Sequence, residues 1–427
     1  MEKNIVYWNP WWNNREYNFQ IKDRDFYPLL NKYIERKEII FFTGVRRSGK
    51  TTAMYKIIHA LLEKVPAENI LYLSMDDNVL SFSTLEEIYK TYKELFPQKK
   101  GKTYILLDEI QNVTNWELWL KTLYDSLEDL KIIVSGSKSY ILKRQSTLLT
   151  GRILEFEIYP LSFIEYTKFK GLDISNKLNK ITNENRIPAL LKDYMQFGAF
   201  PEIVLEEDEQ MKILLGKEYF SNIKNKDIIT YFNIRDARKF DRLSLFLISN
   251  ISKLYSLSKL GQLVSLSPKI VNDYIDFAEM MYLFLPLNHF DYSIKGQITK
   301  PRKIYSIDTG LVNSSAFQFS ENLGRYLENI VFLELKRNAG HNKELYYYSG
   351  KKECDFVIKE DLDVVDVIQV TVEINDDNEK REIDGLVEAM DKFNLERGTI
   401  LTMRQDETRT IHNKTIEIIS LINWLGN

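Results

Sequence analysis

The octapeptide Gly-Val-Arg-Arg-Ser-Gly-Lys-Thr at residues 44–51 fills every fixed position of the phosphate-binding loop pattern G-x-x-x-x-G-K-[ST]. In such a loop, successive backbone N–H groups surround the phosphates of a nucleotide, the lysine contacts the β- and γ-phosphates, and the hydroxyl binds Mg²⁺. An apolar run at 38–43 precedes the loop, and the helix expected after it points its positive end at the same anion. The sequence therefore predicts a site for ATP and Mg²⁺.

The residues expected to bind the cofactors are Gly44, Arg46, Arg47, Ser48, Gly49, Lys50, Thr51, Thr52 and Asp108. Arg46 and Arg47 are expected to add positive charge near the phosphates. The alternative is that both side chains face solvent.

Residues 104–109, Tyr-Ile-Leu-Leu-Asp-Glu, form an apolar run that ends in two carboxylates, as in a Walker B motif. A strand buried in a parallel sheet delivers its last residue to the carboxyl edge, where ligands bind. We therefore expect Asp108 to bind Mg²⁺ beside Thr51. Glu109 is then placed to polarise a water for attack on the γ-phosphate, and with Lys50 it is a predicted catalytic residue.

Two more candidate catalytic residues follow the fourth expected strand. Ser137 lies where many hydrolysing P-loop proteins place a polar residue between the two Walker motifs, and its alternative role is to cap the next helix. Arg152 lies at the start of the fifth expected strand, just before residue 153. In the usual strand order it cannot easily reach its own nucleotide, but it can reach a neighbour's in a ring. The alternative for Arg152 is a surface ion pair.

Short apolar runs alternate with helical patterns from residue 39 to about residue 160, which is typical of a parallel sheet covered by helices. The expected strands are 39–43, 70–75, 104–108, 132–135 and 153–158. The expected helices are 51–64, 83–96, 114–128 and 138–148. The fold class predicted for the chain is therefore α/β, with a P-loop parallel-sheet core.

Beyond the core the pattern first turns helical, at residues 161–240. Residues 241–315 then predict a helix-turn-helix, at 256–264 and 269–280, followed by a wing of two extended runs at 282–288 and 302–308. The polar residues 295–297 separate these two runs. Residues 316–427 predict a second α/β unit. The expected domains are thus 1–160, 161–240, 241–315 and 316–427.

Composition narrows the class of protein. The chain has 427 residues, which favours two or three domains, and its net charge of −3 gives no overall attraction to nucleic acid. The single cysteine, Cys354, and four scattered histidines support neither a disulfide framework nor a zinc site. A signal-peptide pattern is missing, and the most apolar short run, 280–287, is too short to span a membrane. We expect a cytoplasmic protein without membrane contact.

Taken together, the motifs resemble those of archaeal and bacterial AAA+-type ATPases that carry a nuclease-like C-terminal domain. The segments that carry the resemblance are 44–51, 107–113 followed by Trp116 and Trp119, 135–137, 151–152, 160–166, 198–202 and 303–311. They cover almost the whole chain. The resemblance implies an ATPase core at 1–160, a helical lid at 161–240, a winged helix at 241–315 and a restriction-endonuclease-like domain at 316–427.

A nuclease of that fold uses acidic residues and a Glu/Gln-x-Lys strand to bind Mg²⁺ and position water. The matching residues are Glu328, Asp355 and Gln369, but Thr371 stands where the lysine is expected. Since threonine cannot supply the cation, we expect a degenerate site that does not cleave. Lys351 or Lys352 could take the lysine's place.

Three functions remain open at this point. The first is an ATP-hydrolysing homo-oligomer, the second a monomeric nucleotide-dependent switch that recruits a protein partner, and the third a DNA-directed nuclease. DNA contact is possible through the C-terminal domain or the winged helix. In the winged helix, acidic residues of the second helix oppose DNA contact, whereas Lys295, Lys300, Arg302 and Lys303 of the wing favour it. The tryptophans at 8, 11 and 12 can stack on a base or anchor the core.

Overall fold

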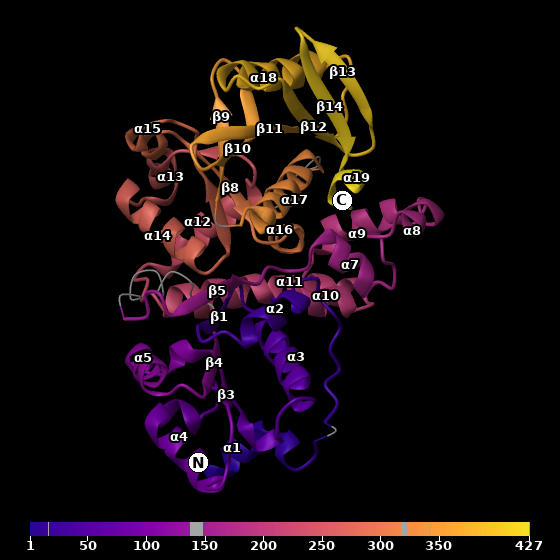
Figure 1. Ribbon diagram of the computed structural model, residues 1–427. Helices are drawn as coiled ribbons and strands as arrows, with labels where there is room; N and C mark the ends of the chain where they lie inside the picture. Colours follow the sequence, from indigo (N-terminus) through magenta and orange to yellow (C-terminus); the bar gives the residue numbers. More distant parts are fainter. Residues whose placement is uncertain (16, 137–147, 317–322, 341, 427) are drawn as a thin grey trace. The chain divides into compact units, whose positions relative to one another are not determined.

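The computed structural model describes residues 1–15, 17–136, 148–316, 323–340 and 342–426 (Figure 1). The chain divides into two compact units, Met1–Tyr159 and Pro160–Asn427. The three domains expected beyond residue 160 all fall in the second unit, and their subdivision stays a prediction. Among the described helices, none combines the length and apolar character that a membrane span requires.

The first unit is built on a five-stranded parallel sheet in the order β2-β3-β4-β1-β5. Its strands are β1 (Ile39–Thr43), β2 (Ile70–Ser74), β3 (Thr103–Asp108), β4 (Leu130–Ser135) and β5 (Ile153–Glu157). Every residue of the first four strands is buried, so both faces must be apolar and the strands appear in the sequence as continuous apolar runs. The predicted α/β parallel sheet is confirmed.

Helices cover both faces of this sheet (Figure 1). One core cluster packs α2 (Tyr27–Ile34) and α3 (Lys50–Leu62) on the sheet, and another packs α4 (Leu85–Leu95) and α5 (Trp116–Ser126). A capping box at Thr84 and Glu87 fixes the start of α4. The helix expected at 138–148 falls almost wholly on residues outside the described ranges.

The N-terminal tryptophans serve as core anchors along the edge strand β2. They belong to α1 (Glu2–Trp8) and to a 3₁₀ turn at Pro10–Trp12. Trp12 Nε1 donates to the Ile70 carbonyl at 2.9 Å, and Trp11 is buried. The Asn9 side chain exchanges two hydrogen bonds with the backbone of Tyr72, at 2.7 and 2.8 Å. This segment covers an edge whose free backbone groups would otherwise invite pairing with another chain.

The second unit begins with helices. They are α7 (Phe163–Phe169), α8 (Lys177–Thr182), α9 (Ile187–Phe197), α10 (Pro201–Leu205), α11 (Glu209–Asn222), a π-helical stretch at Ile223–Thr230 and α12 (Ala237–Ser249). The helical pattern expected for residues 161–240 is therefore present.

A helix pair and a small antiparallel sheet follow. The elements are β6 (Leu254–Tyr255), α13 (Leu257–Val264), α14 (Pro268–Met280), β7 (Phe284–Leu287), α15 (Ile294–Thr299) and β8 (Arg302–Ser306), with the sheet order β6-β8-β7. The polar residues 295–297 lie between β7 and β8, as the sequence predicts, and they belong to the short helix α15, which the sequence does not predict. Ser293 accepts the Gly296 N–H at 3.0 Å and starts the short helix α15 there.

The rest of the unit contains a six-stranded mixed sheet in the order β13-β14-β12-β11-β10-β9. Its strands are β9 (Lys343–Ser349), β10 (Glu353–Glu360), β11 (Asp363–Val370), β12 (Arg397–Thr402), β13 (Glu407–Ile411) and β14 (Lys414–Ser420). The helices are α16 (Thr309–Ser315), α17 (Leu323–Asn338), α18 (Glu379–Lys392) and α19 (Leu421–Leu425). The order helix, three strands, helix, strand runs from α17 to β12.

Asp308 joins the end of β8 to the turn before α10. Its carboxylate accepts the N–H groups of Gly310 at 2.8 Å and Leu311 at 3.2 Å, which caps α16, and the Ala199 N–H at 2.6 Å. Burial raises the pKa of Asp308 to about 7 in spite of these three donors. The segments 198–202 and 303–311 are therefore packed directly on each other.

Candidate functional site

The phosphate-binding loop connects β1 to α3 in a shape that depends on glycine. Gly44 has φ +138°, and a Cβ there would overlap the backbone of Ile158. Gly49 is the N-cap of α3 and lies in the left-handed region. A side chain at Gly44 would therefore displace the loop from β5, which explains the first fixed position of the motif.

Two buried groups of the loop point to an anionic ligand. Lys50 is buried, and its Nζ donates to the carbonyls of Gly44 and Val45, each at 3.1 Å. Ser48 Oγ is also buried and finds no hydrogen-bond partner among the described residues. An unsatisfied buried hydroxyl is costly, and a bound phosphate oxygen would satisfy it.

Arg24 braces the loop from outside the motif. Its guanidinium donates to the Ser48 carbonyl at 2.9 Å and to the Tyr159 carbonyl at 3.1 Å, and the residue is buried. The sequence did not reveal this role, because Arg24 lies in an irregular segment with no motif around it.

The two Walker motifs meet at Asp108. Thr51, in the first turn of α3, donates its hydroxyl to Asp108 Oδ2 at 2.5 Å, although the two residues are 57 positions apart. Tyr72 on β2 donates to the same oxygen at 3.2 Å, and Ser135 on β4 donates to Oδ1. A carboxylate beside a hydroxyl is a ligand pair suited to Mg²⁺.

The pKa of the Asp108 carboxyl group is raised above its usual value as the net result of opposing effects. Burial and the neighbouring Glu109 raise the pKa of its carboxyl group, whereas hydrogen bonds from Ser135 and Thr51 lower it. A buried carboxylate held among hydroxyl donors favours a cation, because a bound cation would offset the cost of its desolvation.

Glu109 has the left-handed backbone conformation, with φ +54°. Its N–H donates to Ser135 Oγ at 3.1 Å, and Gln111 donates its side-chain amide to the Glu109 carboxylate. Ser135 therefore contacts both acidic residues of the Walker B motif. Sequence reasoning selected Ser137 for a role at this position, but Ser137 lies outside the described residues. The sequence feature that could have identified Ser135 is its position as the last residue of β4, the strand that lies between β1 and β3 in the sheet.

The other loop residues are more open. Arg46 and Thr52 are half-buried and Arg47 is exposed. A role for the two arginines beside the phosphates stays a prediction.

Arg152 forms an ion pair on the surface of its own unit. Its Nε and a terminal nitrogen donate to the two oxygens of Asp125 at 2.9 and 3.1 Å, and its guanidinium lies 5.8 Å from the centre of the Tyr124 ring. The side chain of Arg152 is 28% exposed. This is the surface pair that the sequence left open as the alternative.

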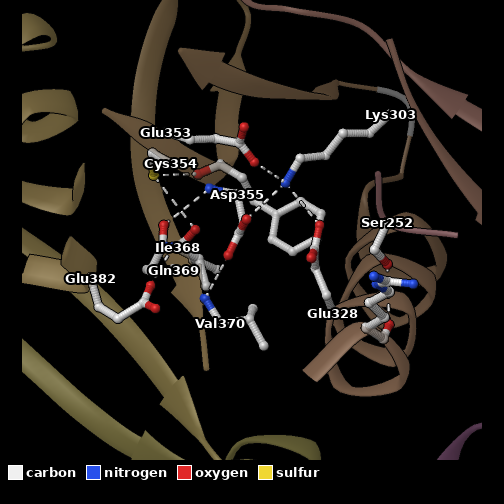
Figure 2. Close-up of polar contacts among 12 residues, drawn as sticks. Ser252, Lys303, Glu328, Glu353, Cys354, Asp355, Ile368, Gln369, Val370 and Glu382 are labelled. Atoms are coloured by element: carbon white, nitrogen blue, oxygen red, sulfur yellow. Dashed lines mark hydrogen bonds and ion pairs between the residues drawn. The ribbon is translucent and has the colours of Figure 1, made fainter. Parts of the chain in front are cut away.

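The acidic residues predicted for the C-terminal domain also converge, but on an unexpected partner. Glu328 of α17 and Asp355 of β10 both bind Lys303 of β8 (Figure 2). Gln369 accepts the Asp355 N–H at 3.2 Å and donates to Glu382 at 2.7 Å. Lys351 and Lys352, the lysines considered as replacements for Thr371, instead donate their backbone N–H groups to Glu388.

The predicted basic wing is only partly available. Lys295 and Lys300 are exposed. Arg302 donates to the Asn272 side chain at 2.7 Å, and Lys303 is 1% exposed. The assignment of Lys303 to a DNA-contacting wing was therefore wrong, because three carboxylates hold it in the interior.

Comparison with known proteins assigns the chain to a family. A model described as an AAA domain matches residues 36–167, which include both Walker motifs. An uncharacterized protein of Methanocaldococcus jannaschii is 33% identical over 417 residues, covering 93% of this chain and 91% of the relative. The chain belongs to a family of AAA-type P-loop ATPases. An uncharacterized protein of Haemophilus influenzae is a further relative of this AAA-type protein, 29% identical over 95% of the chain and 96% of its own length.

The remainder of the AAA-type protein matches two models described as domains of unknown function, at residues 188–322 and 323–424. Among solved structures, the Aeropyrum pernix ORC1 protein in complex with DNA is similar at a TM-score of 0.35 and 12% identity, covering 71% of this chain and 95% of that one. A likeness this weak carries no argument about function.

Proposed function

We propose that this protein binds and hydrolyses Mg·ATP at the site formed by the loop 44–51, Asp108 and Glu109. The observation that carries the proposal is the direct hydrogen bond between Thr51 and Asp108, with Glu109 held beside them by Ser135. These contacts bring a phosphate-binding loop, a cation ligand pair and a second carboxylate to one edge of a parallel sheet.

The residues present suit both cofactors. Ser48 Oγ and the backbone of the loop offer donors for phosphate oxygens, and Lys50 can turn from the two loop carbonyls to an anion. Thr51 and Asp108 offer oxygen ligands for Mg²⁺. Bound Mg²⁺ would neutralise charge on the phosphates. Glu109 would accept a proton from water as its general base.

Phosphate release from ATP by the full chain tests this proposal, with Mg²⁺ present and after its removal with EDTA. We expect turnover with Mg²⁺ and a return to the uncatalysed rate with EDTA, since the Thr51–Asp108 pair has no function in hydrolysis without a cation. Addition of excess Mg²⁺ should restore the rate. Equal phosphate release with and without Mg²⁺ would contradict the proposal.

The proposal extends to a homo-oligomer in which Arg152 completes a neighbour's site. Exposed ion pairs contribute little to stability, so Arg152 can leave Asp125 at little cost. The bond to Asp125 also favours the second candidate, a monomeric nucleotide-dependent switch. It gives Arg152 a structural role within its own chain, so no neighbouring subunit is needed to explain this arginine.

Mixing two inactive variants separates these candidates. Glu109→Gln lacks the base but keeps Arg152, whereas Arg152→Ala lacks the guanidinium but keeps the site. In an oligomer with Arg152 acting on a neighbour, the mixture should regain part of the ATPase activity that each variant lacks alone. Asp125→Ala, which removes only the surface partner of Arg152, should stay active. An Arg152→Ala variant as active as wild type would favour the monomer.

The domain roles belong to the same proposal. Helices α13 and α14, with β7 and β8 after them, support a winged helix at 241–315. The helices before them support a lid at 161–240, and the order from α17 to β12 supports a restriction-endonuclease-like domain at 316–427. Contact with DNA through the wing would depend on Lys295 and Lys300, which are exposed.

A further inference from the structure

Lys303 lies at the centre of the carboxylate cluster of the second unit (Figure 2). Its Nζ is 2.7 Å from Asp355 Oδ1, 2.8 Å from Glu353 Oε1 and 2.9 Å from Glu328 Oε1. The lysine comes from β8, whereas the carboxylates come from α17 and β10, so one ammonium group joins three elements.

Two of these carboxylates also accept hydrogen bonds from groups other than Lys303. Asp355 Oδ2 accepts the Val370 N–H at 2.9 Å, and Tyr305 donates to Glu328 Oε1 at 2.8 Å. Thr371, at the position of the expected lysine, donates to the Glu373 carbonyl at 3.2 Å. Among the described residues, no group of three or more acidic, histidine or cysteine side chains is arranged to hold a metal ion.

The electrostatics favour a permanently charged lysine. Burial alone would lower the pKa of Lys303, but Asp355, Glu328 and Glu353 together raise it well above its usual value. Burial also raises the pKa of Glu328 to about 7, with Asp355 acting in the same direction. The ammonium therefore compensates carboxylates that are otherwise costly to bury.

A catalytic lysine would have a different geometry. In a metal-dependent nuclease the carboxylates bind the cation, and the cation and a lysine together act on water and phosphate. Here Lys303 itself occupies the point on which the carboxylates converge. The metal that the nuclease resemblance implies therefore does not fit the residues present.

We propose that the Lys303 ammonium occupies the cation position of this cluster and closes it to divalent metal ions. The ion pairs of Lys303 with Glu328, Glu353 and Asp355 keep the C-terminal domain from binding Mg²⁺ or Mn²⁺. They also connect β8 to α17 and β10. The proposal is independent of ATP hydrolysis in the first unit.

Mn²⁺ binding to the full chain tests this proposal, measured by electron paramagnetic resonance without nucleotide. All proteins carry Asp108→Asn, which removes the Walker carboxylate from the measurement. We expect no Mn²⁺ site that depends on Asp355 in this background. Lys303→Met should create one such site per chain, and adding Asp355→Asn should abolish it. Lys300→Met, at an exposed lysine three residues away, is the matched control and should create none.

Two results would overturn the proposal. One is a Mn²⁺ site in the protein with native Lys303 that disappears with Asp355→Asn. The other is a folded Lys303→Met protein without any Asp355-dependent site. If Lys303→Met does not fold, Mn²⁺ binding is compared between two proteins that both keep Lys303, one with Asp355 and one with Asp355→Asn. This comparison tests the proposal without any Lys303 variant.

Discussion

Replacing Glu109 with glutamine should abolish ATP hydrolysis while ATP binding is retained. Glutamine keeps the size of the side chain and can still contact Gln111, but it cannot accept a proton from water. General bases contribute about 10²–10⁴ in rate, and we expect a loss of that size in turnover. The binding groups Lys50, Thr51 and Asp108 are unchanged, so the affinity for ATP should stay close to that of wild type.

Turnover is measured as phosphate release, and affinity with a fluorescent ATP analogue. Glu86→Gln is the matched control: it makes the same change at an exposed glutamate of α4 and should hydrolyse ATP normally. Turnover by Glu109→Gln above about a tenth of the wild-type rate would show that Glu109 is not the base. Loss of ATP affinity together with turnover would assign Glu109 to binding instead.

Replacing Gly310 with alanine should destabilise the second unit by about 3 kcal/mol, at the upper end of the usual cost of overpacking. A Cβ at Gly310 would overlap the Phe197 carbonyl and lie 2.8 Å from the Gly198 nitrogen. These are backbone atoms, so no change of side-chain rotamer can relieve the overlap. The hydrogen bond from the Ala199 N–H to Asp308, at 2.6 Å, would be strained as the two segments separate.

Thermal unfolding of the full chain, followed by calorimetry, measures this effect. Gly324→Ala is the matched control, since a Cβ there would meet only Val372, at 3.7 Å, and alanine is the better helix former in α17. We expect Gly310→Ala to lower the melting temperature of the second unit while ATP binding in the first unit persists. An unchanged melting temperature would mean that segments 198–202 and 303–311 can separate at no cost.

The parallel sheet of the first unit was predictable because its signals are local. A strand buried on both faces must be apolar throughout, and the loop after β1 carries its own pattern of glycines. The strand β13 could not be predicted for the opposite reason: its residues, Glu-Thr-Arg-Thr-Ile, are exposed or half-buried and largely polar, so nothing in their sequence requires a strand.

The errors in the sites came from contacts between distant residues. In the sequence, Lys303 follows Lys300 and Arg302, and this group of basic residues is typical of a DNA-contacting wing. Its partners Glu328 and Asp355 lie 25 and 52 positions further along the chain, and only the fold brings them to it. Ser135 was overlooked in a similar way, because its two bonds to the Walker B carboxylate residues depend on β4 lying next to β3.

Strand β8 is held near both ends by buried side-chain contacts, and this limits how the second unit can move. Near its start, Lys303 is bonded to α17 and β10, and just beyond its end Asp308 is bonded to the turn at Ala199. The five-residue strand β8 has a buried ionisable side chain near each end, so it cannot slip along its axis without breaking the hydrogen bonds of Lys303 or Asp308. A displacement of the C-terminal sheet is therefore expected to strain the contact of Asp308 with Ala199 as well.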